Sequence, residues 1–331
     1  MTEFNVEVVR LDQSEKHPNA DSLSITHIFG GYPVVYRTEN FKQGDKLVYI
    51  PIDSLVPLSD SRFAFLSEDE GKKTFRIKAK KLRGIFSMGM LVPADEEWEI
   101  GENVQEKLGI VKWEPPPPKQ FRGSFGPSDQ ESDPGVIPMY TDLDSLRKYK
   151  SVFADGEEVI LTEKIHGANA RFVWSDDRLW VGSHKQFKKE NENNAWWKIA
   201  KQYNLGEILN KNPDVAIYGE MYGTVQDLRY GAAPGDLMFA AFDVMDAKTG
   251  RYYKYDDFKK FCDDNKIPTA PELYRGPWSD DLKAMANGKS TIADHVREGF
   301  VARSVDERWN DRVGRVVLKL VGQDYLLRKN A

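Results

Sequence analysis

Hydrophobic and polar positions follow two different patterns along the chain. Up to about residue 112, short runs of β-branched and aromatic residues are separated by Gly-Gly, Gly-Asp and Pro, which is typical of short strands joined by turns. The expected strands are residues 6–11, 21–29, 32–38, 45–52, 75–82 and 89–93. So many short strands in so short a segment predict a small barrel, most simply an OB-fold, with a β-sandwich as the alternative.

Beyond residue 135 the pattern changes, and strand-like runs alternate with helical periodicity. The expected strands are residues 157–164, 170–175, 178–183, 215–221, 237–245, 298–304 and 314–321. Helices are predicted over 194–209, 255–265 and 279–286, the last with Ser279 as N-cap and Gly288 as its stop.

Between these two parts lies WEPPPPKQFRGSFGPSDQESDPG, residues 113–135. Four consecutive prolines stiffen the backbone, and the Gly, Ser and Asp that follow cannot build a core. We therefore expect an OB-fold domain over residues 1–112, a linker over 113–135 and a second domain over 136–331.

Composition narrows the class of protein. The 331 residues suggest two domains, and 40% hydrophobic with 12% aromatic residues is enough for real cores. The net charge of -5 argues against a uniformly basic nucleic-acid binder but leaves room for local basic patches. The single cysteine, Cys262, excludes an internal disulfide and a cysteine-cluster zinc site, and its apolar neighbours predict a core position. No signal peptide or membrane span is evident, so a cytoplasmic protein without a membrane partner is expected.

Five of the apolar strands of the second domain carry a charge at one end or inside them. These charged residues are Lys164, Glu220, Asp243, Glu298 and Lys319. Isolated buried charges are costly, so such residues are usually paired, bound to metal or neutralised. One interpretation is a set of buried ion pairs, or strand ends that reach solvent. As an ordered set, two lysines and three carboxylates better suit a pocket that holds a polyphosphate and a divalent cation together.

The phosphate-binding loops of common nucleotide sites are absent. The chain contains neither GxxxxGK[ST] nor GxGxxG, which excludes the P-loop and the Rossmann fingerprint at the motif level. A lysine at the floor of a pocket can instead act as a nucleophile if desolvation or nearby positive charge lowers its pKa. Lys319 and a metal ion are the available sources of positive charge.

At this point the residues resemble a known family. Lys164-Ile165-His166-Gly167, followed by Asn169, resembles the nucleotidyl-acceptor motif of covalent nucleotidyltransferases, in the Lys-x-His-Gly form of RNA ligases. The family's later motifs resemble, in the same order, YGEMYG with Glu220, AAFDV with Phe242 and Asp243, EGFV starting at Glu298, and the strand with Lys319. HPNAD (residues 17–21) and IKAKKLRG (residues 77–84) resemble the OB domain of nick-sealing ATP-dependent RNA ligases that carry this domain first.

The resemblance implies an α+β protein: an amino-terminal OB-fold β-barrel, then an ATP-grasp-like ligase/capping nucleotidyltransferase domain of antiparallel sheets with flanking helices. It implies an ATP-dependent RNA ligase that seals 3′-OH/5′-phosphate breaks in RNA repair. Lys164 would form a covalent lysyl-AMP intermediate, from which AMP moves to the 5′-phosphate end. The implied cofactors are ATP, with AMP as the covalent adduct, and Mg²⁺ or Mn²⁺. The implied partner is RNA or an RNA-containing nicked duplex, and a monomer is expected.

The resemblance also assigns roles to individual residues. Lys164 is the nucleophile, and Lys319, Glu220 and Glu298 complete the catalytic set. The expected nucleotide contacts are Glu163, Lys164, His166, Gly167, Asn169, Glu220, Phe242, Asp243, Glu298, Val301, Arg303 and Lys319. Within this set Glu163 and Phe242 would contact adenine, with Val301 on the opposite face, and His166 and Asn169 would organise the phosphates. The expected metal contacts, direct or through water, are Glu220, Glu298 and Asp243.

Two departures from the family's pattern are visible. The fifth motif is usually Lys-x-Lys, whereas the neighbours two positions from Lys319 are Val317 and Val321. The basic residue expected after the first motif falls in VGSHKQFKK, where Ser183, His184, Lys185 and Lys188 are all candidates. Core packing is the alternative role for Phe242 and Val301.

A basic stretch in the first domain suggests where nucleic acid binds. If residues 75–82 form one strand, then Arg76, Lys78 and Lys80 point to one side and can neutralise phosphates without reading bases. Lys185 of the second domain is a further candidate. A charged edge strand that discourages aggregation is the alternative.

Two other classes of function stay open. The first is a capping-type guanylyltransferase or a DNA ligase, which would share the lysine chemistry, but these enzymes usually carry an OB domain after the nucleotidyltransferase domain. The second is an RNA-binding OB protein whose nucleotidyltransferase domain is inactive, and the missing second lysine is its best support.

Overall fold

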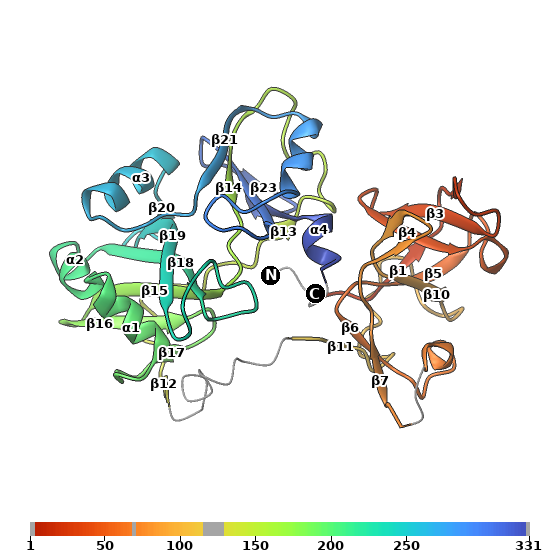
Figure 1. Cartoon of the computed structure of the whole chain (residues 1–331), viewed down its shortest axis with the longest axis horizontal. Coiled ribbons are helices and arrows are strands. Elements are labelled where there is room, and N and C mark those ends of the chain that lie inside the picture. The colour runs from red at the N-terminus through yellow and green to blue at the C-terminus, as the bar shows by residue number, and fades with distance from the viewer. Residues whose placement is uncertain (1–3, 68–70, 115–128, 329–331) are drawn as a thin grey trace.

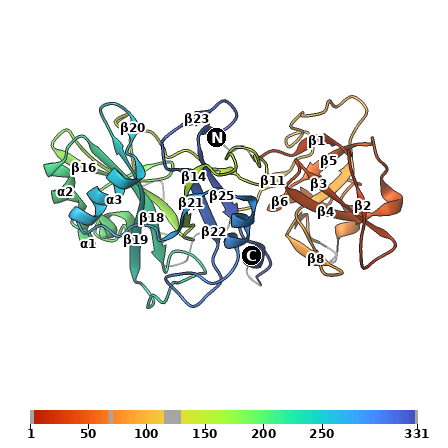
Figure 2. The same ribbon diagram turned by 90° about the horizontal axis from the view of Figure 1, so that it is seen from above.

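The protein was studied as a computed structural model, which describes residues 4–67, 71–114 and 129–328. The proline-rich part of the predicted linker, residues 115–128, lies outside the described residues. The rest forms an all-β amino-terminal lobe and a larger carboxy-terminal lobe of sheets and helices (Figure 1). Seen from above, the five-stranded sheet of the larger lobe lies between the amino-terminal lobe and the seven-stranded sheet (Figure 2).

The amino-terminal lobe consists of short, mostly antiparallel strands. Its sheets have the orders β1-β5-β10, β2-β3-β4, β11-β6-β7 and β8-β9. Their bounds are Glu7–Arg10 (β1), Glu15–Lys16 (β2), Leu23–Ile28 (β3), Tyr32–Arg37 (β4), Lys46–Ile50 (β5), Ser54–Pro57 (β6), Thr74–Arg76 (β7), Lys80–Leu82 (β8), Ile85–Ser87 (β9), Met90–Pro93 (β10) and Val111–Lys112 (β11). Two 3₁₀-helices, Thr38–Asn40 and Ala64–Leu66, complete it. Val8, Val48 and Val92 stand side by side in β1, β5 and β10 and are buried in the core of this lobe.

One predicted strand is wrong as a continuous element. Residues 75–82 form two strands, β7 and β8, separated by residues 77–79. The backbone of Ile77 still pairs with Asp53 and Ser54, but β8 then turns back onto β9 through Arg83 and Gly84, both with positive φ. Because the hairpin redirects the chain, the basic residues of this stretch do not lie on one strand face.

The carboxy-terminal lobe contains two sheets. The seven-stranded sheet has the order β12-β17-β16-β15-β18-β19-β20, and the five-stranded sheet has the order β13-β25-β22-β14-β21. The first sheet comprises Gln130–Glu131 (β12), Ala168–Ser175 (β15), Arg178–Ser183 (β16), Phe187–Lys188 (β17), Val215–Gly223 (β18), Leu237–Asp246 (β19) and Arg251–Tyr252 (β20). The second comprises Asp144–Ser145 (β13), Glu158–Glu163 (β14), Glu272–Pro277 (β21), Gly299–Ser304 (β22) and Val317–Val321 (β25). A separate hairpin joins Trp309–Asn310 (β23) to Gly314–Arg315 (β24).

The helices of this lobe are short. They are Ala195–Gln202 (α1), Leu205–Lys211 (α2), Tyr255–Asp264 (α3), the 3₁₀-helix Asp280–Ala286, and Gln323–Leu326 (α4). Residues 194–209 were expected to form one helix, but Asn204 adopts a left-handed conformation (φ 53°) that interrupts it. The helix expected over 279–286 is a 3₁₀-helix, and Ser279 makes no side-chain cap. The strand predicted over 314–321 is split into β24 and β25, which belong to different sheets. Apart from this strand and residues 75–82, the predicted strands and the helix over 255–265 are confirmed to within a few residues.

Helices α1, α2 and α3 cover one face of the seven-stranded sheet (Figure 1). Phe172 and Phe239 of the sheet meet edge to face there, and Trp196 of α1 is buried in the same core. Cys262 of α3 belongs to this core and is fully buried, as its apolar neighbours predicted. Burial raises the pKa of its thiol to about 12, so it is not a reactive thiolate at neutral pH.

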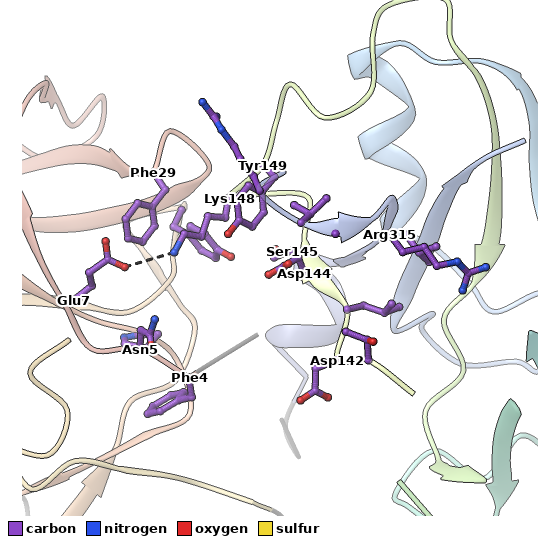
Figure 3. A pocket seen from close by; sticks show the side chains of 18 of the residues that line it. Phe4, Asn5, Glu7, Phe29, Asp142, Asp144, Ser145, Lys148, Tyr149 and Arg315 are labelled. Carbon is purple, nitrogen blue, oxygen red and sulfur yellow. Dashed lines mark hydrogen bonds and ion pairs between the residues drawn. The ribbon is translucent and has the colours of Figure 1, made fainter. Parts of the chain in front are cut away.

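The two lobes contact each other along the segment that carries β13. Gly31 approaches so closely that a Cβ atom there would lie 1.9 Å from the carbonyl oxygen of Arg147. Beside this contact is a cavity of about 580 Å³, across which Glu7 and Lys148 pair at 3.5 Å between Oε2 and Nζ (Figure 3). The Lys148 ammonium also lies 4.6 Å from the centroid of the Phe29 ring. The amino-terminal lobe is therefore held against the five-stranded sheet.

Within the described ranges, none of the helices has the length and apolar content that crossing a membrane requires.

Candidate active site

The two sheets of the carboxy-terminal lobe each contribute a row of side chains to one pocket. Directly paired residues on neighbouring strands point to the same face of a sheet. The row from β15, β18 and β19 is Asn169, Glu220 and Ala240, and the row from β14, β22 and β25 is Thr162, Val301 and Lys319. All six residues line a pocket of about 220 Å³. The pocket is therefore built by strand register, which is a rigid way to place functional groups.

The structure brings most of the predicted nucleotide-contacting residues into this pocket. They are Glu163, Lys164, Asn169, Glu220, Phe242, Val301, Arg303 and Lys319. The pocket is also lined by residues for which the sequence predicted no role. These are Tyr140, Thr141, Asp142, Leu143, Thr162, Ile165, Ala240, Tyr255 and Ala270. Residues 140–143 follow the linker and show no strand or helix pattern, so only the fold could place them here. His184, one of the candidates after the first motif, is another lining residue.

Lys164 lies immediately after β14, where its backbone N–H donates to the carbonyl oxygen of Gly299 at 3.0 Å. Its Nζ is 2.7 Å from Oε1 of Glu298. Burial by itself would lower the pKa of Lys164, but the carboxylates of Glu298 and Glu220 outweigh it and hold the pKa above the ordinary value. We expected the surroundings to lower this pKa, but the protein alone raises it. The amine of Lys164 is therefore held as an ammonium.

The pKa values of the two carboxyl groups beside Lys164 are shifted in opposite directions. Burial raises the pKa of Glu220 to about 7, although Lys164 partly offsets this. Burial also acts on Glu298, but the charges of Lys164 and His166 outweigh it and lower the pKa of Glu298 to about 2. Glu298 is therefore the ionised partner of the lysine, whereas Glu220 is a carboxyl group that would gain from an additional cation.

Lys319 faces the same pocket from β25. Burial, followed by repulsion from Lys164, lowers its pKa below the ordinary value. Within the part of the chain that the structure describes, its ammonium is in no ion pair of 4.0 Å or less. A partly buried ammonium that is in no close ion pair is suited to bind an anion such as a phosphate.

Two lining residues present acceptor atoms without partners. Oε2 of Glu163 accepts hydrogen bonds from the backbone N–H and the hydroxyl of Thr291, at 2.8 and 2.6 Å. The other oxygen, Oε1, has no partner among the described residues, nor has Oδ1 of Asn169. Buried acceptors are rarely left unsatisfied, so both atoms fit a ligand that brings hydrogen-bond donors. Thr291 lies seven residues before Glu298 but belongs to none of the motifs, and nothing in the sequence pointed to it.

A β-bulge places Phe242. Tyr218 pairs with Asp243 and Gly219 pairs with Ala241, so Phe242 has no residue opposite it on β18. Bulges redirect side chains next to functional sites. The ring of Phe242 lines the pocket and packs edge-on against Tyr140, with 4.7 Å between the centroids.

Asp243 lies outside the pocket lining and is fully buried. Its carboxylate accepts hydrogen bonds from Arg303 and from the Tyr140 hydroxyl, both at 2.8 Å, and from Arg315. Burial would raise the pKa of Asp243, but the two arginines outweigh it and lower the pKa. We therefore correct the predicted metal contact: the oxygens of Asp243 are already used in an ion-pair cluster, with Arg315 a member that the sequence did not suggest.

His166 and Gly167 do not line the nucleotide-sized pocket either. Gly167 lies so close to β18 that a Cβ atom would be 2.1 Å from the carbonyl oxygen of Met221, which explains a glycine in the Lys-x-His-Gly turn. His166 lines a separate cavity between the two lobes, together with Glu298. Its ring bonds Asp227 and Tyr325, at 2.8 and 3.0 Å. The prediction that His166 organises nucleotide phosphates is not met by this placement.

No group of three or more His, Cys, Asp or Glu residues suited to a metal ion occurs within the described ranges. The carboxylates next to Lys164 are Glu220 and Glu298, and Oε2 of Glu298 lacks a hydrogen-bond partner in the described part of the chain. Mg²⁺ is commonly held by one or two carboxylates together with substrate phosphates and waters. Glu220 and Glu298 fit that kind of site. The described residues do not form a metal cage made only of protein ligands.

The predicted nucleic-acid contacts are spread over different surroundings. Arg76 pairs with Asp53 and stacks on the ring of Trp113, 3.3 Å from its centroid. Lys78 is exposed and, with Arg76, borders the cavity between the lobes that also contains His166. Exposed Lys80 lies 5.8 Å from the Phe75 ring centroid, and Lys185 is exposed beside the pocket residue His184. Lys78, Lys80 and Lys185 are thus the accessible members of the set.

A lysine that follows a strand and faces a pocket between two largely antiparallel sheets is the arrangement of the covalent nucleotidyltransferase class. Residues 157–321 match the sequence model of the RNA ligase family, and residues 5–94 match a model described as an OB-fold domain. The chain belongs to the RNA ligase family, and its α+β architecture with a leading OB-fold is confirmed.

The fold is shared with solved RNA ligase structures. Naegleria gruberi RNA ligase with PPi is 24% identical to this chain and superposes with a TM-score of 0.85. The match covers 99% of this chain and 99% of the Naegleria chain. A mutant of that ligase with ATP and Mn is 23% identical, with 99% and 100% coverage and a TM-score of 0.85. A third structure, of a mutant with AMP and Mn, has 23% identity, 98% coverage of each chain and a TM-score of 0.83.

Curated proteins of similar sequence match a smaller part of this chain. The phenylalanine–tRNA ligase beta subunit of Protochlamydia amoebophila is 42% identical over 86 residues, which is 25% of this chain and 9% of that protein. The corresponding subunit of Geobacter metallireducens is 32% identical over 109 residues, 32% of this chain and 11% of that protein. The chain thus spans only about a tenth of the length of these relatives, and their activity is not carried over.

Proposed function

We propose that the chain joins RNA ends with ATP through a covalent lysyl-AMP intermediate on Lys164. The observation that carries this proposal is the placement of Lys164, Lys319 and Glu220 around one pocket, with Glu298 bonded to the lysine. Family membership supports RNA as the substrate. Naegleria gruberi RNA ligase has been solved with ATP and Mn, with AMP and Mn, and with PPi, which supports ATP and a divalent metal as the cofactors here.

In the first step, Nζ of Lys164 attacks the α-phosphorus of ATP. A phosphorus–nitrogen bond forms, the bond to the bridging oxygen breaks, and pyrophosphate leaves while the amine loses its proton. Lys319 stabilises the charge that develops on the α-phosphate oxygens, as a preorganised donor does in other acyl and phosphoryl transfers. Within the pocket, Phe242 and Val301 would sandwich the base, and the free oxygen of Glu163 would accept from its amino group.

In the second and third steps the AMP is transferred and then released. A 5′-phosphate oxygen of RNA attacks the phosphorus of lysyl-AMP, which frees Lys164 and gives an adenylylated end. The 3′-OH at the other end of the break then attacks that 5′-phosphate and loses its proton, a phosphodiester forms, and AMP leaves with its own phosphate. Sealing of a nicked duplex, a role in RNA repair, a monomeric state and a cytoplasmic location remain predictions.

A divalent cation is expected at Glu220 and Glu298. When bound, it supplies positive charge that neutralises the phosphates and favours the ionised form of Glu220. It also offers these carboxylates a partner other than Lys164, which would lower the pKa of the amine toward the neutral form that nucleophilic attack needs.

Label transfer tests the proposal. The protein is incubated with Mg²⁺ and ATP labelled at the α-phosphate, and label on the protein is measured after denaturation. We expect label with ATP in the native protein and in Lys248→Ala, a control at an exposed lysine, and none in Lys164→Ala. Label from GTP instead would favour a guanylyltransferase. No label from either nucleotide would favour an RNA-binding protein with an inactive domain.

A further inference from the structure

The His166 imidazole is held from both sides by residues that no motif contains. Asp227, from the loop after β18, lies 2.8 Å from its Nε2. The hydroxyl of Tyr325, from α4 near the carboxy-terminal end of the described chain, lies 3.0 Å from its Nδ1. The two aromatic rings meet edge to face, with 5.5 Å between their centroids. The orientation of this imidazole is therefore fixed by two distant segments.

Arg328 ties these two segments together. Its Nε and Nη2 donate to Asp227, both at 3.2 Å, and its guanidinium lies 3.6 Å from the centroid of the Tyr325 ring. Helix α4 is itself anchored, because Oδ1 of Asn287 accepts from the backbone N–H of Gln323 at 2.7 Å. Asp227, Tyr325 and Arg328, which we call the latch, thus form one connected network around His166.

The latch connects to the nucleophile through one carboxylate. Oε1 of Glu298 is 2.7 Å from Nζ of Lys164, and Oε2 of the same group is 3.6 Å from Nδ1 of His166. Glu298 thus stands between the lysine on the pocket side and the imidazole on the side of the cavity between the lobes. When Lys164 attacks a phosphate it must leave Glu298, and the imidazole is the neighbouring group toward which that carboxylate can turn.

We propose that the latch of Asp227, Tyr325 and Arg328 is a positioning device for the adenylylation step: it fixes His166 beside Glu298 so that the carboxylate has a second partner when Lys164 turns to the phosphate. This inference rests on the proposed function. Residues that orient a group next to a reacting centre commonly affect activity about as much as some direct contacts do. Because the latch touches neither the pocket nor the nucleophile, it should affect the rate of attack more than nucleotide affinity.

The test measures enzyme adenylylation with ATP and, separately, the sealing of an RNA nick whose 5′-phosphate already carries AMP. In Asp227→Asn we expect kcat for adenylylation to fall about tenfold or more, with KM for ATP within about twofold of native. Tyr325→Phe, which removes one hydroxyl, should lose about threefold to tenfold. Sealing of the pre-adenylylated nick should change less than adenylylation, because Lys164 need not leave Glu298 in that step.

Asp256→Asn is the matched control. Asp256 forms a two-bond ion pair with Arg275, at 2.6 and 2.9 Å, far along the chain from the latch. This variant should adenylylate like native protein. Asp227→Glu, which keeps the carboxylate, should recover part of the rate, and a thermal melt of each variant separates lost folding from lost positioning.

The outcomes distinguish the latch from the proposed function. If native protein takes no label from ATP, the proposed function fails first. If native protein is labelled and both Asp227→Asn and Tyr325→Phe are labelled at the native rate, the latch is refuted. It is also refuted if the variants lose adenylylation and sealing of the pre-adenylylated nick equally, because the residues would then serve general stability of the site.

Discussion

Nζ of Lys164 lies 2.7 Å from Oε1 of Glu298, so the residue that we propose as the nucleophile is held as a cation by a carboxylate. The lysine directly follows β14 and the glutamate directly precedes β22, and these strands are neighbours in one sheet. The protein alone thus keeps the amine of Lys164 protonated, a form in which it cannot attack phosphorus. ATP and a divalent cation, which compete for the same groups, would release it.

This relationship predicts a change in the titration of Lys164. In Glu298→Gln the main group that raises the pKa of the lysine is removed, so the pKa of Lys164 should fall. The measurement is labelling of Lys164 by an amine-reactive reagent as a function of pH, read by mass spectrometry of the peptide. Lys248 in the same digest serves as the internal control. An unchanged midpoint for Lys164 would contradict the assigned role of Glu298.

Glu220 should make stability depend on pH. Its pKa is raised to about 7, so the folded protein binds more protons than the unfolded chain between its ordinary pKa and about 7. Stability contributed by this group therefore falls as pH rises through that window. In Glu220→Gln this loss disappears, and the fall in unfolding free energy between pH 5 and pH 8 should be smaller by about 1 kcal/mol or more. Denaturant unfolding at both pH values measures it, with Glu158→Gln, on the exposed side of β14, as the control.

The Asp243 cluster should be a stability element. Asp243→Asn leaves Arg303 without its buried counter-ion and Arg315 with Glu307 alone. Removing one partner of a buried ion pair typically costs about 3–5 kcal/mol of unfolding free energy. Asp214→Asn, which breaks an exposed pair with Lys248, should cost less than about 1 kcal/mol. Equal losses in the two variants would argue that Asp243 is not the centre of a buried cluster.

Gly167 should be intolerant of any side chain. In Gly167→Ala the new Cβ would overlap the carbonyl oxygen of Met221, so the turn that carries Lys164 must shift. A displacement of about 1 Å at a reacting group can reduce the rate about a hundredfold. Gly206→Ala in α2 is the control: its Cβ would meet only Leu179 at 3.7 Å, and adenylylation should stay native. A Gly167→Ala protein with the native rate would show that the turn is adaptable.

The accessible basic residues of the first lobe should carry salt-dependent RNA binding. Replacing Lys78 and Lys80 together with Ala should weaken binding and reduce the slope of log K against log salt by about one per lost phosphate contact. Lys248→Ala is the control on the other lobe. Arg76→Ala is expected to act differently, because Arg76 holds Asp53 and Trp113 and its loss should lower stability. Unchanged binding at low and moderate salt in the double variant would refute the contact.

The sequence predicted the local elements well where a short pattern sufficed. The strands that carry Lys164, Glu220 and Lys319 were placed within a few residues, because alternation of apolar residues and turn chemistry are local properties. It failed where a single backbone angle decided the outcome, at Asn204 between α1 and α2 and at the hairpin after Lys80. Neither angle is dictated by hydrophobic periodicity.

By itself, then, the sequence determined which strands exist, in what order the charged motifs follow one another, and that a lysine stands at the end of a buried strand. Only the tertiary structure decided which partner each charge takes: Asp243 bonds two arginines, and His166 faces Asp227 and Tyr325 rather than the pocket. The reason is physical. Strand formation depends on neighbours in sequence, whereas an ion pair or a hydrogen bond depends on distances of a few ångströms between segments far apart in the chain, which strand register and bulges set.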